Sequence, residues 1–334
     1  SLGWAHAMDT PYQWTKRVAS HWGGTRNGLI VHWPAGIRSR GELRHQFHHV
    51  IDVAPTFLEL AKLPQPLMVN GVEQQPIEGI SMAYTFNDPG AAERHETQYF
   101  EILGNRGIYH KGWTAVTAHN TPVSRRPLPK LEDDIWELYD TNTDWTQAND
   151  LSQKYPEKLR ELQRHFLIEA AKYNVLPLDD RAAYRADPDL AGRPVLAKER
   201  KQRLYSGIGR LNAFCVINIK NKSHRLKAEI VVPACGCEGV IVAQGGFPGG
   251  WSLYTKEGHL KYCYNFYGID LFHIGTPEPI PPGKHIVGMD FEYDGGGVAK
   301  GGLVRLSVDN RIMGEGRVER TQPLPFASDE PLEI

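Results

Sequence analysis

A lysine, two adjacent glycines and an arginine lie close together near the start of the chain and could bind an anion. Lys16 precedes Gly23-Gly24 and Arg26, and the apolar run Leu29-Ile30-Val31 follows. A glycine pair allows backbone angles that other residues avoid, so the chain can reverse sharply or approach another group closely there. A lysine before such a turn can present its ammonium group to an anionic ligand, or it can lie in solvent. The residue types alone leave both interpretations open.

A second stretch with titratable side chains covers residues 38–49. Its histidines His45, His48 and His49 lie close enough in sequence to form a metal site, although such clusters more often mark the solvated start of a helix. The segment that follows has apolar residues at helical spacing, and Pro55 falls near the N-terminal turn, where proline is tolerated. We therefore expect a helix over 50–61. Its core-facing residues would be Val50, Val53, Phe57, Leu58 and Ala61.

The elements expected to position Lys16 are a helix before the glycines and a strand after them. Asp9-Thr10-Pro11 has an N-cap residue and a proline for the first helical position, which predicts a short helix from about Pro11 to Ala19. Lys16 would lie near the C-terminal end of that helix. The run at 29–31 predicts a buried strand of an α/β sheet. Arg26 is expected to be structural, pairing with a carboxylate or capping carbonyl groups.

The order of the sequence blocks resembles one enzyme family. Five ordered blocks over residues 16–165 resemble the type I sulfatases, the arylsulfatase-like family of the alkaline-phosphatase superfamily. In the first block, Trp22 stands where the family usually has Glu, and Gly28 stands where it usually has Pro. The resemblance implies that the chain is the C-terminal portion of such a protein. The blocks are 16–34, 48–61, 77–82, 98–113 and 136–159.

The resemblance also implies a chemistry, the hydrolysis of a small-molecule sulfate ester by a formylglycine nucleophile with calcium as cofactor. Lys16 matches the family's sulfate-binding lysine and is assigned the catalytic role, and His48 and His45 are the substrate-binding candidates. The family makes formylglycine from a cysteine in a Cys-x-Pro/Ala-x-Arg context. None of the cysteines has that context: Cys215, Cys235, Cys237 and Cys263. The nucleophile and the calcium ligands are therefore expected upstream, no metal ligand is assigned in this chain, and the chain alone is expected to be inactive.

The predicted organisation is an α/β part followed by an all-β part. Residues 1–175 are expected to be the C-terminal part of an alkaline-phosphatase-like sulfatase domain, with strands and a 156–173 helix forming a small antiparallel subdomain. Residues 176–200 are charged and contain prolines, which is typical of a linker. From 201 to 334, short strand-like runs between glycine-rich turns predict an accessory β-sandwich. These runs are 212–219, 228–232, 239–244, 251–255, 261–266, 284–293, 303–309 and 311–318.

Composition excludes several classes of partner. The chain has 334 residues, with 38 basic and 39 acidic side chains, so its charge gives no footprint for nucleic acid or an anionic membrane. Hydrophobic residues make up 41% without a long uncharged apolar run, which indicates a soluble protein. The sequence leaves its compartment open, cytoplasmic or periplasmic if the source is bacterial. The four cysteines are expected to be reduced core or loop residues.

Two other functions fit parts of the sequence. A phosphatase or phosphodiesterase of the same superfamily would share the lysine block but use another nucleophile. A non-catalytic glycan-binding module would place the function in residues 201–334, where aromatic side chains could stack on a sugar ring or could belong to the core. These aromatic residues are Trp251, Tyr254, Tyr262, Tyr264 and Tyr267.

Overall fold

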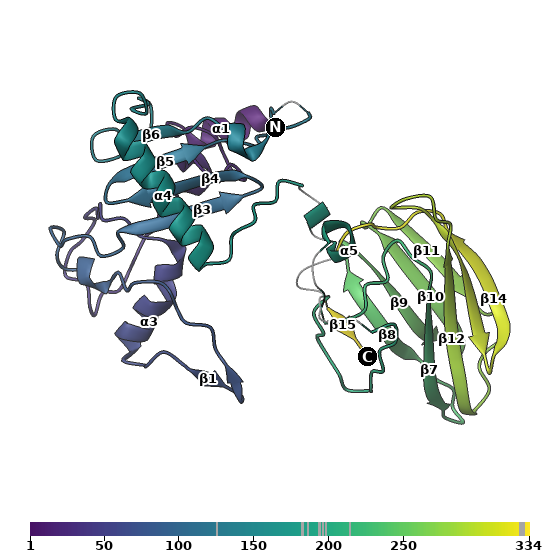
Figure 1. The fold of residues 1–334 in the computed structure, drawn as a ribbon. Helices are drawn as coiled ribbons and strands as arrows, with labels where there is room; N and C mark the ends of the chain where they lie inside the picture. Colours follow the sequence, from purple (N-terminus) through teal and green to yellow (C-terminus); the bar gives the residue numbers. More distant parts are fainter. Residues whose placement is uncertain are drawn as a thin grey trace. The chain divides into compact units, whose positions relative to one another are not determined.

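The chain forms two compact units, Ser1–Asp180 and Arg181–Ile334 (Figure 1). The computed structural model describes residues 1–124, 126–181, 184–185, 187–192, 195, 197, 199–213, 215–326 and 331–334. The division falls inside the stretch expected as a linker, 176–200, in which the short helix α5 (Pro188–Ala191) forms. Seven positions of that stretch lie outside the described residues: 182, 183, 186, 193, 194, 196 and 198.

The first unit is built on a four-stranded antiparallel sheet in the order β3-β4-β5-β6. Its strands are β3 (Thr97–Ile102), β4 (Asn105–His110), β5 (Trp113–Thr117) and β6 (Glu137–Asp140). The sequence predicts only one turn before Val116, at Gly104-Asn105. The structure has a second turn at Lys111-Gly112, where both residues have positive φ angles of 48° and 81°. The segment after the first turn is therefore two strands rather than one.

Helix α4 (Pro156–Lys172) covers one face of this sheet, as the sequence predicts. Pro156 lies at the start of the helix, where its missing N–H costs no hydrogen bond. The buried side of the helix packs against alternate residues of β4, β5 and β6, because side chains along a strand alternate between its two faces. The resulting hydrophobic core consists of Ile108, Ala115, Leu138, Leu162, Phe166 and Ala170.

The helix expected over 50–61 is present, but its buried side is polar. It begins as a 3₁₀ turn, η1 (Val50–Asp52), and continues as α3 (Val53–Ala61). Asp52 and Thr56 are buried, whereas Val50 and Phe57 are 75% and 69% exposed. The prediction that apolar residues form the buried side is wrong. The buried side carries Asp52 and Thr56 instead, because these two side chains accept hydrogen bonds from backbone N–H groups of the segment at 80–82.

Two elements expected around Lys16 do not form. Residues 11–19 make turns instead of a helix, because Trp14 and Arg17 have positive φ angles of 65° and 84°, which an α-helix excludes. Leu29, Ile30 and Val31 are 60%, 94% and 44% exposed and form no strand. A buried strand needs a neighbouring strand for its backbone groups, and the described residues supply none for this run.

Among the described residues, no helix combines the length and the apolar character needed to cross a bilayer.

The rest of the first unit consists of short elements. The short elements are α1 (Leu2–Asp9), α2 (Trp22–Thr25), β1 (Met68–Val69), β2 (Val72–Glu73), η2 (Ala83–Thr85) and η3 (Leu131–Asp133).

The second unit has two antiparallel sheets, with strand orders β11-β10-β9-β8-β15 and β14-β13-β12-β7. The run expected at 212–219 is not a strand in its described residues, which exclude 214; only Leu211 forms an isolated bridge there, to Leu332. The other seven predicted runs coincide with strands, whereas β11 and β15 were not predicted. The strands are β7 (His224–Val232), β8 (Gly239–Gly246), β9 (Gly249–Lys256), β10 (His259–Phe266), β11 (Asp270–Gly275), β12 (Gly283–Tyr293), β13 (Gly302–Val308), β14 (Arg311–Val318) and β15 (Leu332–Glu333).

Residues of both sheets form one hydrophobic core, including Leu253 from one sheet and Met289 from the other. Trp251, Tyr262 and Tyr264 are buried in this core and present no ring for a sugar to stack on. The four cysteines are free, as expected.

Candidate functional site

The loop that carries Lys16 closes tightly over α2. A Cβ on Gly23 would lie 2.3 Å from the carbonyl oxygens of Gln13 and Trp14, and a Cβ on Gly24 would lie 1.9 Å from the carbonyl oxygen of Val18. Such distances are shorter than any van der Waals contact, so only glycine fits at both positions. The glycine pair therefore allows a close backbone approach that fixes the course of residues 13–18.

Long-range hydrogen bonds attach this loop to the sheet. The Trp22 N–H donates to Gln147 Oε1 at 2.8 Å, and Gln147 Nε2 donates to Thr114 Oγ1 on β5 at 2.9 Å. Asn105 Nδ2, at the start of β4, donates to the Arg17 carbonyl oxygen at 3.3 Å. The loop contacts the sheet face that bears Thr114, which is opposite to the face that packs on α4.

A buried histidine adds a further link between the loop and the sheet. His21 Nε2 lies 3.0 Å from Glu137 Oε2 on β6, and Ser20 Oγ lies 3.0 Å from His21 Nδ1. Serine, histidine and glutamate in this order resemble a nucleophile with its base, but Ser20 and His21 are fully buried and cannot meet a substrate. The hydrogen bond with His21, together with that from the Tyr139 hydroxyl, holds the pKa of Glu137 below its ordinary value. The group therefore serves as a structural hydrogen-bond link between the loop and β6.

Lys16 itself is exposed in the turn between two backbone outliers. Its neighbours Trp14 and Arg17 both have positive φ angles, which cost free energy in residues other than glycine. In the described part of the chain, the Lys16 ammonium group has no hydrogen bond or ion pair. A strained, anchored loop thus presents an unpaired cation to solvent.

Arg26 has a different role from the expected one. Its guanidinium lies 4.4 Å from the centroid of the Trp22 ring and 5.3 Å from that of the Tyr12 ring. No carboxylate partner of Arg26 occurs among the described residues. The arginine is structural, but it acts through cation–π stacking that holds α2 against the preceding loop.

The substrate-binding candidates differ in their surroundings. His45 is exposed, whereas His48 is half-buried, and its Nδ1 lies 3.7 Å from Asp52 Oδ2. Both ring nitrogens of His48 are shielded and lack a hydrogen-bond partner among the described residues. Buried polar atoms are nearly always paired in folded proteins, so two unpaired nitrogens in one ring are unusual.

Asp52 is the centre of a polar cluster beside His48. Its carboxylate accepts hydrogen bonds from the His49 and Ile80 N–H groups, both at 2.8 Å, and each of its oxygens lies 2.8 Å from His95 Nδ1. Burial alone would raise the pKa of Asp52. The imidazoles of His48 and His95 and the two N–H groups outweigh burial and hold this pKa well below its ordinary range, so the carboxylate is ionised.

The pKa values of His95 and His49, which both lie near Asp52, are shifted in opposite directions. Burial lowers the pKa of His95, but its hydrogen bond to Asp52 and the attraction of that carboxylate raise it above the ordinary value overall. Burial, reinforced by repulsion from His95, lowers the pKa of His49. His95 is therefore the more readily protonated of the two, and its protonated form pairs with Asp52.

The structure brings together two of the blocks that carry the family resemblance, 48–61 and 77–82. A Cβ on Gly79 would lie 2.1 Å from the Ile51 carbonyl oxygen, so glycine is required where the second block crosses the first. The Met82 N–H donates to Thr56 Oγ1 at 2.9 Å, and Ile80 binds Asp52 as described above. These contacts explain why the two blocks occur together.

The Lys16 loop and the His48 segment cover the same face of the sheet. Phe47 stacks on Tyr109 of β4 with ring centroids 3.9 Å apart, and Tyr109 pairs with Thr114, which binds the Lys16 loop through Gln147. Within the described ranges, no hydrogen bond, ion pair or ring contact joins Lys16, His45 and His48 to one another.

Sequence reasoning missed the residues that hold these segments in place. Asp52 and His95 are 43 positions apart, and Trp22 and Gln147 are 125 apart, so no local spacing connects them. The only sign of this cluster in the sequence was the aspartate inside the 48–61 block. The partners of such polar residues can be identified only once the fold is known.

The residues present do not fit the two groups that the family resemblance implies. All four cysteines lie in the second unit, and none has the formylglycine context. Among the described residues, the group of side chains placed to hold a metal is His110, Glu161 and His165. Calcium binds through oxygen ligands, so a set with two imidazoles does not suit it. The cysteines therefore do not supply the nucleophile, and the described residues show no set of oxygen ligands suited to calcium.

The close approach at Gly24 makes a testable prediction. We expect Gly24→Ala to destabilise the first unit by about 1–3 kcal/mol, because the new methyl group would overlap the Val18 carbonyl oxygen and displace the Lys16 loop. Hydrogen exchange of residues 13–24 and chemical unfolding measure the effect. Gly28→Ala is the matched control, since nothing lies within 4 Å of its Cβ position. Equal stability and equal exchange in the two variants would contradict the assigned role of Gly24.

Comparisons with known proteins find a family model and a curated relative described as sulfatases. Residues 5–63 match the family model Sulfatase. A curated protein of Schizosaccharomyces pombe, described as an uncharacterized sulfatase, is 26% identical over 186 residues, which are 53% of this chain and 30% of that protein. A solved structure reported for the metabolism of multiple glycosaminoglycans by Bacteroides thetaiotaomicron is 23% identical with a TM-score of 0.35, over 47% of this chain and 31% of that one. The match thus spans 30% of the length of the curated relative.

Proposed function

We propose that this sulfatase-like chain is the C-terminal portion of a sulfuric ester hydrolase of the arylsulfatase type. The observation that carries the proposal is the exposed, unpaired Lys16 on a loop fixed by Gly23-Gly24, inside the segment that matches the sulfatase family model. A sulfatase needs a fixed cation that faces the sulfate group. A lysine on an anchored loop, without a partner among the described residues, meets that need.

Lys16 would act on the charge that develops during cleavage of the ester. Breaking the sulfur–oxygen bond places negative charge on the sulfuryl oxygens and on the departing oxygen. A preorganised ammonium group stabilises that charge more than water does, because it needs no reorientation. The tight loop fixes the backbone that carries Lys16, because residues 13–18 pack closely on Gly23-Gly24.

His48 and His45 are proposed to bind the substrate beside Lys16. The Nδ1 atom of His48 lies 3.7 Å from Asp52 Oδ2, and both ring nitrogens lack a hydrogen-bond partner among the described residues. His45 is exposed and can reach a part of the substrate that extends into solvent. Both residues belong to the segment that covers the same sheet face as the Lys16 loop.

The remaining parts of the enzyme are proposed to lie outside this chain. The formylglycine nucleophile and calcium would come from an upstream part of the protein, because the cysteines and the metal-binding side chains described above do not fit them. The two sheets of the second unit would form an accessory β-sandwich. The chain alone would therefore be inactive.

The test is the activity of the protein that contains this chain together with its upstream part, measured on an aryl sulfate and on the matching aryl phosphate. We expect hydrolysis of the sulfate ester to be the faster reaction and the isolated chain to cleave neither ester. A preference for the phosphate ester would indicate a phosphatase or phosphodiesterase instead. Binding of glycans by residues 201–334 without any hydrolysis would indicate a binding module. Either result would overturn the proposal.

A further inference from the structure

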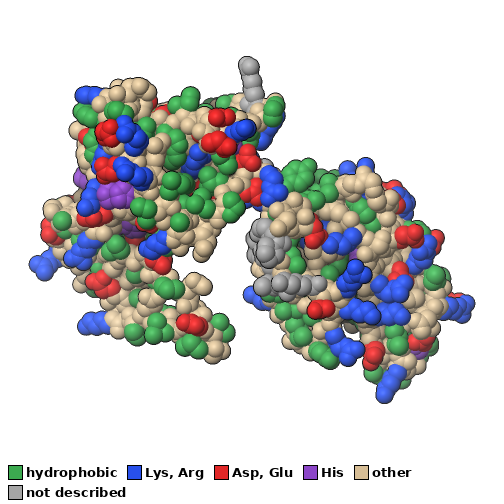
Figure 2. All heavy atoms as spheres, viewed as in Figure 1, with side chains coloured by type: hydrophobic (Ala, Val, Ile, Leu, Met, Phe, Trp, Pro, Cys, Tyr) green, Lys and Arg blue, Asp and Glu red, His purple; other side chains and the backbone are tan. Residues whose placement is uncertain are grey.

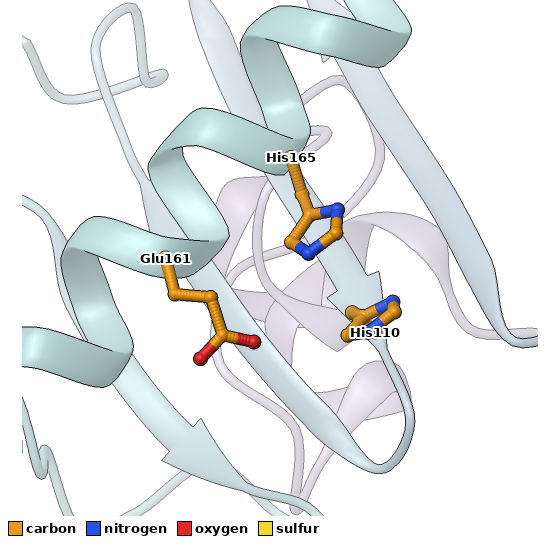
Figure 3. A group of neighbouring side chains, drawn as sticks. All are labelled: His110, Glu161 and His165. Carbon is orange, nitrogen blue, oxygen red and sulfur yellow. The ribbon is translucent and has the colours of Figure 1, made fainter.

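Two histidines and a glutamate gather on the α4 face of the first unit. In the surface view, histidine side chains lie beside both basic and acidic ones on this unit (Figure 2). His110 comes from the end of β4, and Glu161 and His165 come from α4, with their side chains directed toward the same region (Figure 3). One potential ligand atom from each residue lies within 4.8 Å of the others, and all three residues are half-buried.

The fold sets this arrangement through its regular periodicities. Glu161 and His165 are four residues apart, so they lie one above the other on the same side of the helix. His110 lies two residues after the buried Ile108 on β4, so both side chains are on the sheet face that packs against α4. Buried Leu162 and Phe166, each next to one of the helical ligands, fix the rotation of the helix against the sheet. The three side chains are thus positioned by the core.

The contacts of each side chain leave one suitable donor atom free. Thr97 Oγ1 lies 2.8 Å from His110 Nδ1, a contact that orients the ring and leaves Nε2 available, as in many metal sites. Lys158 Nζ donates to Glu161 Oε1 at 2.9 Å, which leaves the second carboxylate oxygen available. Among the described residues, His165 has no hydrogen-bond partner, and its ring stacks on that of His110 with centroids 4.3 Å apart.

This donor set has a recognisable preference. Two imidazole nitrogens and one carboxylate oxygen suit zinc and the neighbouring divalent transition metals, whereas magnesium and calcium prefer oxygen ligands alone. Zinc ligands lie about 2.0–2.2 Å from the ion, which puts them roughly 3.4 Å apart in a tetrahedron. The donor atoms lie within 4.8 Å of one another, so metal binding would require the side chains to move closer together and one of the stacked imidazoles to reorient.

We propose that His110, Glu161 and His165 form a binding site for a divalent transition metal of the zinc class, with a fourth position for water or an external ligand. The bound ion would cross-link α4 to the end of β4. Lys158 competes with the metal for Glu161, so removal of its charge is expected to tighten binding. This site does not rest on the proposed sulfatase activity.

The test is a calorimetric titration of the tag-free, chelator-treated chain with zinc, and a visible absorption spectrum with cobalt(II) in its place. We expect one ion per chain, a shift of thermal unfolding to higher temperature, and at least about tenfold weaker binding in His165→Ala and Glu161→Gln. Lys158→Met should bind zinc more tightly. His6→Ala, which removes an exposed histidine on α1, is the control and should bind as the unmodified chain does.

Three results would overturn the site. They are the absence of saturable binding below about 100 µM zinc, equal affinities in His165→Ala and His6→Ala, and weaker rather than tighter binding in Lys158→Met. Far-UV circular dichroism confirms that each variant is folded before its affinity is compared. Because the readout is metal affinity, the outcome is independent of whether sulfate esters are cleaved.

Discussion

Replacement of Lys16 by alanine in the protein that contains this chain and its upstream part is expected to lower kcat/KM for a sulfate ester by about 10²–10³-fold, or about 2.7–4 kcal/mol of transition-state stabilisation. The physical reason is the loss of a fixed ammonium group that faces the developing charge. The loss should fall mainly on kcat, because this charge is greatest in the transition state. Steady-state kinetics with an aryl sulfate measure both constants.

Two controls separate the charge of Lys16 from its place in the loop. Lys16→Arg keeps a cation and should lose less activity than the alanine variant, although the planar guanidinium does not replace a compact ammonium group fully. Lys62→Ala removes another exposed lysine of the same unit, at the end of α3, and should retain full activity. An unchanged kcat/KM in Lys16→Ala would refute the assignment.

Replacement of Asp52 by alanine should have the largest effect on stability, a loss of about 3–5 kcal/mol. The change would leave the buried N–H groups of His49 and Ile80 without an acceptor and His95 without its ion-pair partner. Unfolding in urea, with hydrogen exchange of residues 48–61 to assign the transition to the first unit, measures the loss. Glu59→Gln is the control, because it removes an exposed carboxylate from the same helix. Similar losses in the two variants would show that the buried pair is unimportant.

The pair of Asp52 and His95 makes the stability of the first unit depend on pH, both in acid and above about pH 6.5. Asp52 has a folded pKa below its ordinary value of 3.8, so its contribution is present above about pH 4 and is lost as the pH falls through the folded pKa. His95 has a folded pKa above its ordinary value of 6.5, so its contribution is complete below about pH 6.5 and is lost as the pH rises through the folded pKa. The pair is therefore most stabilising between these values, and Asp52→Ala should flatten the profile.

The sequence predicted elements whose pattern is local. Helix α4 has a first-turn proline and apolar residues spaced by three and four positions, and the structure contains it at nearly the predicted bounds. Strands such as β14, predicted at 311–318, were also located, because alternation and glycine-rich turns operate over a few residues. A strand such as β11 was missed because apolar Leu271 lies on its exposed face, so the sequence does not show the alternation that the structure has.

Elements that depend on distant partners were predicted less well. The run at 29–31 has the composition of a buried strand, but composition cannot supply a neighbouring strand. The buried side of η1 and α3 is set by Asp52 and Thr56, because these side chains bind the segment 80–82, which lies far along the chain. For the candidate site, Lys16 could be identified only through the family resemblance, and the strain at Trp14 and Arg17 that shapes its loop has no sequence signature.

The topology of the first unit also sets an order of assembly. Neighbouring strands of the sheet are neighbours in sequence, so β3 to β6 and α4 can form from one continuous segment, and the β3–β4 and β4–β5 connections are short turns. The Lys16 loop leaves the ribosome before them, yet its bonds reach 88 and 125 residues ahead, to Asn105 and Gln147. During synthesis this loop must wait for the sheet to be completed and then dock on it. The sheet and α4 can therefore form before the loop does, and changes confined to the exposed Lys16 side chain leave that earlier step intact.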